Sequence, residues 1–377
     1  MRRPGRARTP LGLHDLGKCM EKAYLVLGNG RCFEGRRIGA AGDSTGELVF
    51  TTGMVGYLET LTDPSYAGQI ILQTFPLIGN YGVIPADFEG ESFARGYVVR
   101  ELCDTPSNFR SEYELDRFLK ERGIPGICGV DTRAITRLIR EEGVMNARIS
   151  SVPQPDLAPI QSYRVQGVVA QVSSKTVEEY SAEGPERFHV VLLDYGAKRG
   201  IIRCLRRRGC RVISVPHDTP ADKILAMAPD GLMLSNGPGD PAENTYEIQQ
   251  LRFLIGKLPV FGICLGHQLA ALAMGGKTMK LKYGHRGANQ PVRLTDGSRT
   301  YISSQNHGYA VVSESMAGIA QLSYVNANDL SCEGLEYPGK RCFTVQFHPE
   351  ASAGPRDTEF LFDRFLRMME EDRNAKR

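Results

Sequence analysis

The chain has 377 residues, which is room for two domains, and its net charge of +3 is too small to indicate a nucleic-acid partner. With 41% hydrophobic and 24% charged residues it has the composition of an ordinary globular protein, and no apolar run is long enough to span a membrane. None of the nine cysteines forms a Cys-x-x-Cys pair, and the sequence shows no secretory segment. We therefore expect a reduced, cytoplasmic protein without a metal site.

The first part of the chain is predicted to be an extension followed by a small α+β domain. Residues 1–19 are rich in arginine, as a transit peptide is, but contain no serine, so we expect either that Met20 is the natural start or that these residues are a disordered extension. Residues 20–150 show short β-like runs with turns, then helical patterns, and contain no catalytic motif of their own. The predicted hairpin covers 24–27 and 31–33, the further strands 47–51, 69–74 and 96–100, and the helices 112–122 and 133–142.

A proline-rich connector over residues 151–186 leads to a second pattern over residues 187–377. Strands and helices alternate there, which predicts an α/β domain with a mostly parallel sheet covered on both faces. The predicted strands are 190–193, 211–215, 231–234 and 260–263, the predicted helices 198–208, 220–227 and 358–371, with further β-like runs over 277–347. Sites in such sheets lie at the carboxyl ends of the strands.

Cys264 stands where the buried strand 260–263 turns sharply into a helix that stops at Gly275. Glycine two residues away on either side leaves room for a strained turn. Such a turn holds the thiol at the edge of the sheet, near the positive end of the following helix, which favours the thiolate. We therefore expect Cys264 to be a nucleophile, although an isolated cysteine is usually a buried packing residue.

His348 and Glu350 are the candidates for the base and for the group that orients the base. Their spacing can put both side chains on one side of an extended segment, and Pro349 between them stiffens that segment. In this interpretation His348 takes the proton from Cys264, and Glu350 orients and stabilises the charged imidazole.

A Gly-Pro-Gly turn at residues 237–239 follows the strand 231–234. Backbone N–H groups in such a turn can point at a developing oxyanion, and the N–H of Leu265 would be a second donor. The turn alone is a weak signal, because most such turns are only structural. Near a nucleophile elbow, Gly237 and Leu265 become candidates for an oxyanion hole.

Other residues compete for these roles. His307 is an alternative base, but no carboxylate adjoins it in the sequence. His267 adjoins the nucleophile, and its place on the helix points it away from the pocket. Cys128 lies in a similar Gly-Ile-Cys-Gly segment that lacks the later glycine and a following helix. Residues 275–278 resemble the end of a P-loop, but Ala271 occupies the position of its leading glycine.

The motifs FGICLGHQ, SNGPGDP and FHPE resemble those of the class I, triad-type glutamine amidotransferases. Upstream, LTDPSY at 61–66, GN at 79–80, DTR at 131–133 and DYGAKR at 194–199 resemble the small, glutaminase subunits of carbamoyl-phosphate synthases. The resemblance covers nearly the whole chain from Met20 and implies a flavodoxin-like domain that hydrolyses L-glutamine to glutamate and ammonia. The glutamine-binding residues that it implies are Ser65, Gly237, Gly239, Leu265, Gln268, Asn306, Gly308 and Tyr309, the last in place of the family's usual phenylalanine.

The resemblance also implies a partner, the large subunit of carbamoyl-phosphate synthase, in a heterodimer or a higher oligomer of it. Synthesis needs ATP, and no phosphate-cradling loop is found in this sequence, so ATP and Mg²⁺ are expected on the partner and no cofactor on this chain. The product would serve arginine or pyrimidine biosynthesis.

Two alternative functions stay open. A glutaminase for another synthesis, such as that of GMP or anthranilate, is disfavoured by the segment 61–66 and by the domain order. A non-enzymatic interaction protein of the same fold is disfavoured by the intact Cys264, His348 and Glu350.

Overall fold

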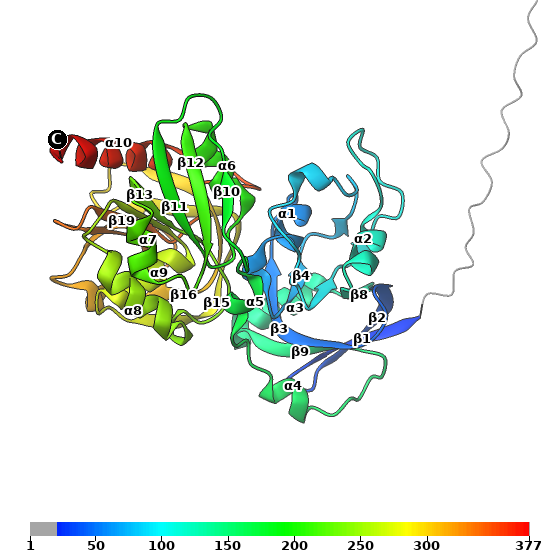
Figure 1. Cartoon of the computed structure of the whole chain (residues 1–377). Coiled ribbons are helices and arrows are strands. Elements are labelled where there is room, and N and C mark those ends of the chain that lie inside the picture. Colours follow the sequence, from blue (N-terminus) through cyan, green and yellow to red (C-terminus); the bar gives the residue numbers. More distant parts are fainter. Residues whose placement is uncertain (1–20, 377) are drawn as a thin grey trace, which may run out of the picture.

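The computed structural model describes residues 21–376, so the predicted extension over residues 1–19 lies outside the described residues. A barrel-containing N-terminal half and a C-terminal half built on one large sheet lie side by side (Figure 1). Within residues 21–376, no helix is both long enough and apolar enough to cross a membrane.

The N-terminal half is a closed seven-stranded barrel in the order β1-β2-β8-β6-β4-β3-β9. The predicted hairpin is confirmed as an antiparallel pair of β1 and β2. The sequence prediction missed β8 and β9, and β9 closes the barrel by pairing with both β1 and β3. The barrel strands are β1 (Lys22–Leu27), β2 (Cys32–Gly39), β3 (Ser44–Thr51), β4 (Gln69–Gln73), β6 (Gly96–Val98), β8 (Pro125–Cys128) and β9 (Met145–Ser150).

Short elements decorate this barrel, and both helices predicted from the sequence are present with slightly different ends. They are α1 (Tyr57–Leu61), the 3₁₀ turns η1 (Pro64–Tyr66) and η2 (Pro85–Asp87), the strand pair β5 (Leu77–Ile78) and β7 (Glu101–Leu102), α2 (Leu115–Glu121) and α3 (Thr132–Glu142). The connector contains regular secondary structure: α4 (Ala158–Ser162), α5 (Val168–Val172) and β10 (Glu178–Tyr180). Of these, β10 pairs with the C-terminal sheet.

The ten-stranded sheet of the C-terminal half is mixed, which corrects the prediction of a mostly parallel sheet. Its parallel part holds β12 (Cys210–Pro216), β11 (Phe188–Asp194), β13 (Gly231–Leu234), β14 (Val260–Ile263) and β19 (Cys342–Val345), in that order. Counted along the chain this order is 2-1-3-4-5, as in flavodoxin-like sheets. The antiparallel part holds β18 (Cys332–Tyr337), β17 (Gln321–Asn326), β15 (Thr278–Leu294) and β16 (Thr300–Val311). No α-helix separates these last four strands, and short connections impose antiparallel pairing.

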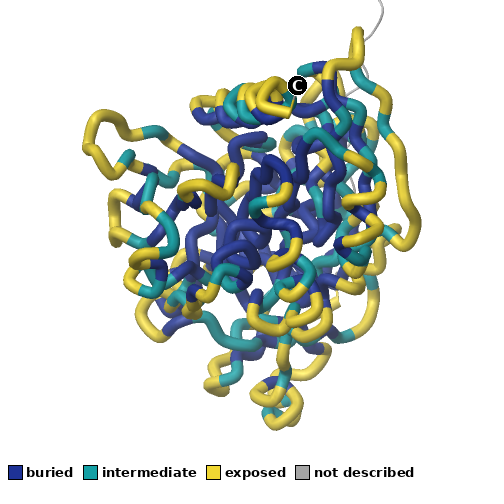
Figure 2. Tube along the Cα trace, turned by 60° about the vertical axis from the view of Figure 1, so that its left-hand side comes forward, coloured by how far each residue is buried: buried dark blue, intermediate teal, exposed yellow. Residues whose placement is uncertain are grey.

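Helices cover both faces of the sheet. On one face Ile224, Leu251 and Leu269 of α7, α8 and α9 pack with Leu232 of β13. On the other face the apolar sides of α6 and α10 pack against β13 and β14, and Figure 2 shows the continuous buried interior. The elements are α6 (Arg199–Arg207), α7 (Ala221–Ala226), η3 (Pro241–Glu243), α8 (Thr245–Leu254), α9 (Leu265–Ala273), η4 (Ser313–Met316) and α10 (Phe360–Ala375), of which α8 was not predicted.

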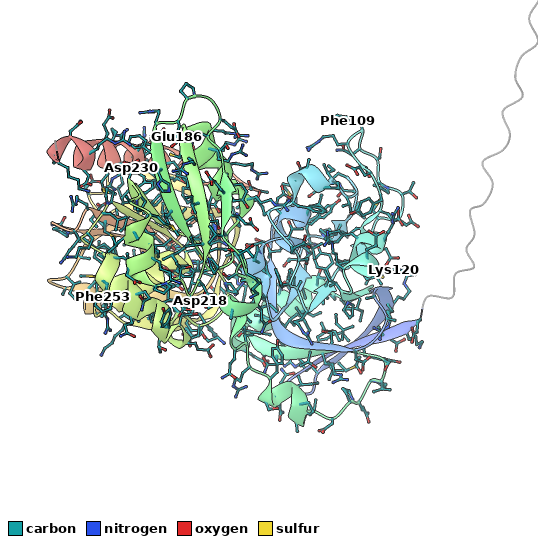
Figure 3. The ribbon with its side chains drawn as sticks, viewed as in Figure 1. Phe109, Lys120, Glu186, Asp218, Asp230 and Phe253 are labelled. Atoms are coloured by element: carbon teal, nitrogen blue, oxygen red, sulfur yellow. The ribbon has the colours of Figure 1, made fainter. Side chains whose placement is uncertain are left out.

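The two ends of the parallel strands can be followed in Figure 3. Glu186 and Asp230 precede β11 and β13 and mark the amino ends, whereas Asp218 follows β12 at the opposite, carboxyl end. Cys264 directly follows β14, so it too lies at a carboxyl end, as the alternating pattern predicted.

Candidate active site

The turn at Cys264 has the strained geometry predicted for a nucleophile elbow. Cys264 separates β14 from α9 and has φ 53° and ψ −105°. A side chain other than glycine rarely adopts such a conformation, and it persists only where the surrounding structure imposes it. The strain therefore marks Cys264 as a residue that the fold holds in a fixed place.

The two flanking glycines are required by close packing. A Cβ on Gly266 would lie 2.5 Å from the carbonyl oxygen of Leu234, so its absence lets α9 approach β13. A Cβ on Gly262 would lie 2.9 Å from Thr344 Cγ2 and 3.0 Å from the backbone of Gly266. The elbow thus depends on glycine for contact with both neighbouring strands as well as for the turn itself.

His348 and Glu350 lie beside this elbow and contact each other. The segment that carries them follows β19, and β19 pairs in parallel with β14, so both segments end at the same edge of the sheet. His348 Nδ1 lies 2.6 Å from Glu350 Oε1, and both side chains are buried. Among the described residues, His348 Nε2 has no hydrogen-bond partner of standard geometry, which leaves this nitrogen available.

The charge state of His348 is set by its neighbours. Burial lowers the pKa of His348, but Glu350 and the adjacent Cys264 thiol outweigh burial and raise it above its usual range. The Cys264 sulfur itself lies 3.8 Å from the carbonyl oxygen of Asn306. A histidine with a raised pKa readily keeps a proton that it takes from a thiol.

Lys198 is a charged neighbour of this pair that the sequence prediction did not assign to the site. Its Nζ lies 3.1 Å from Glu350 Oε1, and both side chains are almost completely buried. Burial raises the pKa of Glu350, but Lys198 and His348 outweigh burial and lower it. Lys198 stands in the DYGAKR motif, so the signal was present, but the sequence does not show which carboxylate the lysine contacts.

A cavity of about 360 Å³ opens beside Cys264, a volume typical of small-molecule sites. Leu265 is absent from its lining, because its side chain is buried in the core, so this residue can contribute only its backbone. Leu265 packs closely against Gly237, where an added Cβ would lie 2.7 Å from Leu265 Cδ2. The predicted residues that do line the cavity are Ser65, Gly237, Gly239, Cys264, Gln268, Asn306, Gly308 and Tyr309.

The N-terminal half supplies part of the cavity wall. Ser65 Oγ accepts a hydrogen bond of 3.0 Å from Asn236 Nδ2, so the predicted reach of Ser65 from the N-terminal half is observed. Asp63, which was not predicted, accepts a hydrogen bond of 3.0 Å from the side-chain amide of Asn306. Both bonds cross the junction between the halves and fix the two walls of the cavity relative to each other.

Three charged side chains in the cavity wall were also missed. Glu47 pairs with Lys280 at 2.6 Å, and both residues line the cavity together with Arg286. Arg286 Nη1 donates to the carbonyl of Tyr283 at 2.6 Å. These residues lie on β3 and β15 outside the motifs, so nothing in the local sequence pointed to them.

The competing residues occupy other surroundings. His307 lines the cavity, but its Nδ1 lies 2.8 Å from the carbonyl oxygen of Tyr309, and burial lowers its pKa well below the usual range. His267 is buried with its Nδ1 2.8 Å from Thr344 Oγ1, so it points away from the cavity as predicted. Cys128 is buried at the end of β8 in the barrel.

One group within residues 21–376 has the spacing of metal ligands, although the sequence predicted none. His285, His307 and Glu333 place their ligand atoms within 4.8 Å of one another. Hydrogen bonds account for this arrangement: Glu333 accepts from Gln305 at 3.0 Å and from Asn326 at 3.3 Å. The cluster was not visible in the sequence because its members come from three different strands.

Comparison with known proteins agrees with this geometry. Residues 25–149 match the family model of the carbamoyl-phosphate synthase small chain, CPSase domain, and residues 191–368 match that of the class I glutamine amidotransferases. The carbamoyl phosphate synthase small chain of Syntrophotalea carbinolica is 47% identical over 374 residues, which is 94% of this chain and 100% of the relative. The chain belongs to the carbamoyl-phosphate synthase small chain family.

Two further members of the family resemble this chain to a similar degree. The small chain of Listeria innocua is 49% identical and covers 93% of this chain and 97% of its own. The pyrimidine-specific small chain of Bacillus subtilis is 46% identical, with coverages of 93% and 96%. Family membership confirms the predicted role as the glutamine-hydrolysing subunit, and the match over 25–149 removes GMP and anthranilate synthesis as alternatives.

Proposed function

We propose that this chain hydrolyses glutamine through Cys264, His348 and Glu350 and delivers the ammonia to a large carbamoyl-phosphate synthase subunit. One observation carries the proposal: a histidine held by a buried carboxylate leaves its second nitrogen free beside a strained cysteine at the wall of a small-molecule cavity. Nucleophile, base and orienting group are the parts that covalent amide hydrolysis needs.

In the first half of the reaction His348 Nε2 takes the proton of the Cys264 thiol. The thiolate attacks the side-chain amide carbon of glutamine and forms a tetrahedral intermediate. Its oxyanion would be held by the backbone N–H groups of Gly237 and Leu265, which the close contact of these two residues keeps together. When the carbon–nitrogen bond breaks, His348 returns its proton to the leaving nitrogen and ammonia departs.

In the second half the γ-glutamyl thioester on Cys264 is hydrolysed. His348 is again a base, removes a proton from water, and the resulting attack releases glutamate and the free thiol. The raised pKa of His348 suits a group that must hold a proton between steps. Throughout, Glu350 keeps the imidazole in one tautomer through its contact with Nδ1.

Glutamine itself would be held by the residues of both halves that line the cavity. Gln268 is fixed for this role, since its Nε2 donates to the carbonyl of Tyr309 at 2.8 Å and to Gln346 at 2.9 Å. We assign contacts with the substrate to the lining residues Ser65, Gly237, Gly239, Gln268, Asn306, Gly308 and Tyr309, and to the backbone of Leu265.

A second, small cavity of about 60 Å³ supports delivery of ammonia to a partner. Its lining includes Lys198, Asn306, His348 and Val55. Val55 and its chain neighbour Met54 are 71% and 66% exposed, an apolar pair of the kind that interfaces bury. We assign ATP and Mg²⁺ to that partner, the reaction to the cytoplasm, and the product to arginine or pyrimidine biosynthesis.

The covalent step provides the test. The complex with its large subunit is mixed with glutamine labelled in the carbon chain, quenched in acid within one turnover and digested. We expect label on the peptide that contains Cys264. Label on another residue, or none while turnover continues, would contradict the mechanism.

A further inference from the structure

Lys198 shares one carboxylate oxygen with the candidate base. Its Nζ lies 3.1 Å from Glu350 Oε1, the oxygen that His348 Nδ1 approaches to 2.6 Å. The ammonium also donates to the carbonyls of Ala351 at 3.1 Å and Ser352 at 3.0 Å. Lys198 therefore contacts both the carboxylate of the triad and the backbone that follows it.

The N-terminal half helps to hold Lys198 in place. The backbone N–H of Lys198 donates to Asn236 Oδ1 at 3.0 Å, and Asn236 also contacts Ser65. The next two N–H groups, of Arg199 and Gly200, donate to the backbone and the carboxylate of Glu89, each at 2.8 Å. Contacts from the barrel half thus fix the first turn of α6 and, with it, the position of the ammonium.

Lys198 keeps its charge in this buried site. Burial lowers its pKa, but the carboxylates of Glu350, Glu89 and Asp63 outweigh burial and raise it. The titratable and charged groups around Lys198, Glu350 and His348 come from both halves of the chain: Glu59, Asp63, Glu89, Arg203, Cys204, Cys264 and His307. Of these, Cys264 and His307 act directly on His348, and burial lowers the pKa of His307 well below its usual range.

We propose that Lys198 is a positioning residue of the glutaminase reaction, which holds Glu350 in line with His348 and whose charge makes the imidazolium give up its proton to the departing ammonia. This inference rests on the proposed function of the triad. A buried carboxylate alone would stabilise the imidazolium of His348 too strongly for proton transfer. A fixed positive charge on the same carboxylate oxygen opposes that stabilisation.

The removal of Lys198 has a predictable sign. Loss of a neighbouring positive charge favours the protonated forms of Cys264 and His348 over their deprotonated forms. The pair therefore loses its protons only at higher pH. Both limbs of the pH profile of kcat/KM should therefore move to higher pH. A residue that merely supports the fold would lower the rate by the same factor at every pH.

The experiment compares Lys198→Met, Lys198→Arg and the wild type in complex with the large subunit. Glutamine-dependent synthesis is measured from pH 6 to 10, and ammonia-dependent synthesis at each pH shows that the complex is intact. Lys223→Met on the exposed face of α7 is the matched control for loss of a lysine charge. We expect the acid limb of Lys198→Met to move up by about one pH unit, which equals a tenfold loss of the glutamine-dependent rate at pH values below that limb. Lys198→Arg and Lys223→Met should keep the wild-type limbs.

A second measurement tests the proposal even if Lys198→Met assembles poorly with the large subunit. Iodoacetamide alkylates Cys264, and the rate of this reaction is followed against pH on the peptide that contains Cys264. The rate reports deprotonation of the same pair without substrate, and it is measured for Lys198→Arg and Lys198→Gln. A limb that moves with Gln and not with Arg supports the proposal. Unmoved limbs, or a loss equal at all pH values, overturn it but leave the triad standing, whereas failure of the triad itself would appear as glutamine-dependent synthesis without Cys264.

Discussion

Asp63 in the N-terminal half and Asn306 in the C-terminal half are joined by a hydrogen bond of 3.0 Å, although 243 positions separate them in the chain. Asn306 lines the cavity, and its carbonyl oxygen lies 3.8 Å from the Cys264 sulfur. A residue without a catalytic role of its own thereby fixes a wall of the site from the other half of the molecule.

The first prediction follows from this bond. Asp63→Ala leaves the buried amide of Asn306 without its partner and also removes the cap that Asp63 gives to the N–H of Ser65. A buried group left unsatisfied costs about 1–3 kcal/mol, so we expect KM for glutamine to rise about tenfold and kcat to change less. Steady-state kinetics of the complex measures this, with the exposed Asp104→Ala as control. An unchanged KM in a folded variant would show that the two walls hold their places without the bond.

The second prediction concerns the elbow. In Gly266→Ala the new Cβ would meet the backbone of Leu234 at 2.5 Å, so α9 must shift away from β13. We expect a loss of about 1–3 kcal/mol of stability and a fall in glutaminase rate of at least a hundredfold, since a displacement of about 1 Å can cost that much. Gly184→Ala is the control for a methyl group added without a clash, because Gly184 has no neighbour within 4 Å; its φ of 86°, which Gly266 does not share, strains the variant but should leave the glutaminase rate unchanged. Equal glutaminase rates for both variants would contradict the prediction.

The third prediction separates the two histidines. His348→Asn removes base and acid together and should lower kcat by about two to four orders of magnitude. Glu350→Gln should cost less, because the imidazole stays present and only its orientation weakens. His307→Asn should act mainly on KM, since His307 supports the cavity wall through Tyr309. If His307→Asn lowers kcat more than His348→Asn does, the base has been assigned to the wrong residue.

The sequence predicted best what is decided locally. The strand 260–263 and the strained turn at Cys264 were predicted to the residue, because an apolar run, two glycines and a helix former specify that geometry within a few positions. Helix ends differed by a few residues, and α8 was missed because its weakly amphipathic sequence gave no clear period.

What the sequence did not show depends on contacts between distant segments. Barrel closure by β9 and the antiparallel half of the large sheet follow from pairing partners, and period-2 patterns do not name a partner. The same holds for the side chains. Lys198 and Glu350 are buried charges that stabilise each other, and only the fold shows that the lysine contacts this carboxylate rather than another.

The fourth prediction concerns the partner. The cavity lies between the two halves, so a small adjustment of their contact changes the site geometry. We expect the chain alone to hydrolyse glutamine slowly and the large subunit with its nucleotide to accelerate it, through a coupling of about 1–3 kcal/mol. Glutaminase kinetics with and without the large subunit measures the effect, and the large subunit without nucleotide is the control. Equal turnover in all three conditions would mean that the site is complete without its partner.

The most direct measurement of the central claim uses Cys264→Ala in the complex. Carbamoyl phosphate formation is followed with glutamine and, separately, with ammonia as the nitrogen source. If Cys264 acts only in releasing ammonia, glutamine-dependent synthesis is lost while ammonia-dependent synthesis continues at the wild-type rate. Retained glutamine-dependent synthesis would contradict the assignment of Cys264 as the nucleophile, and with it the proposed mechanism.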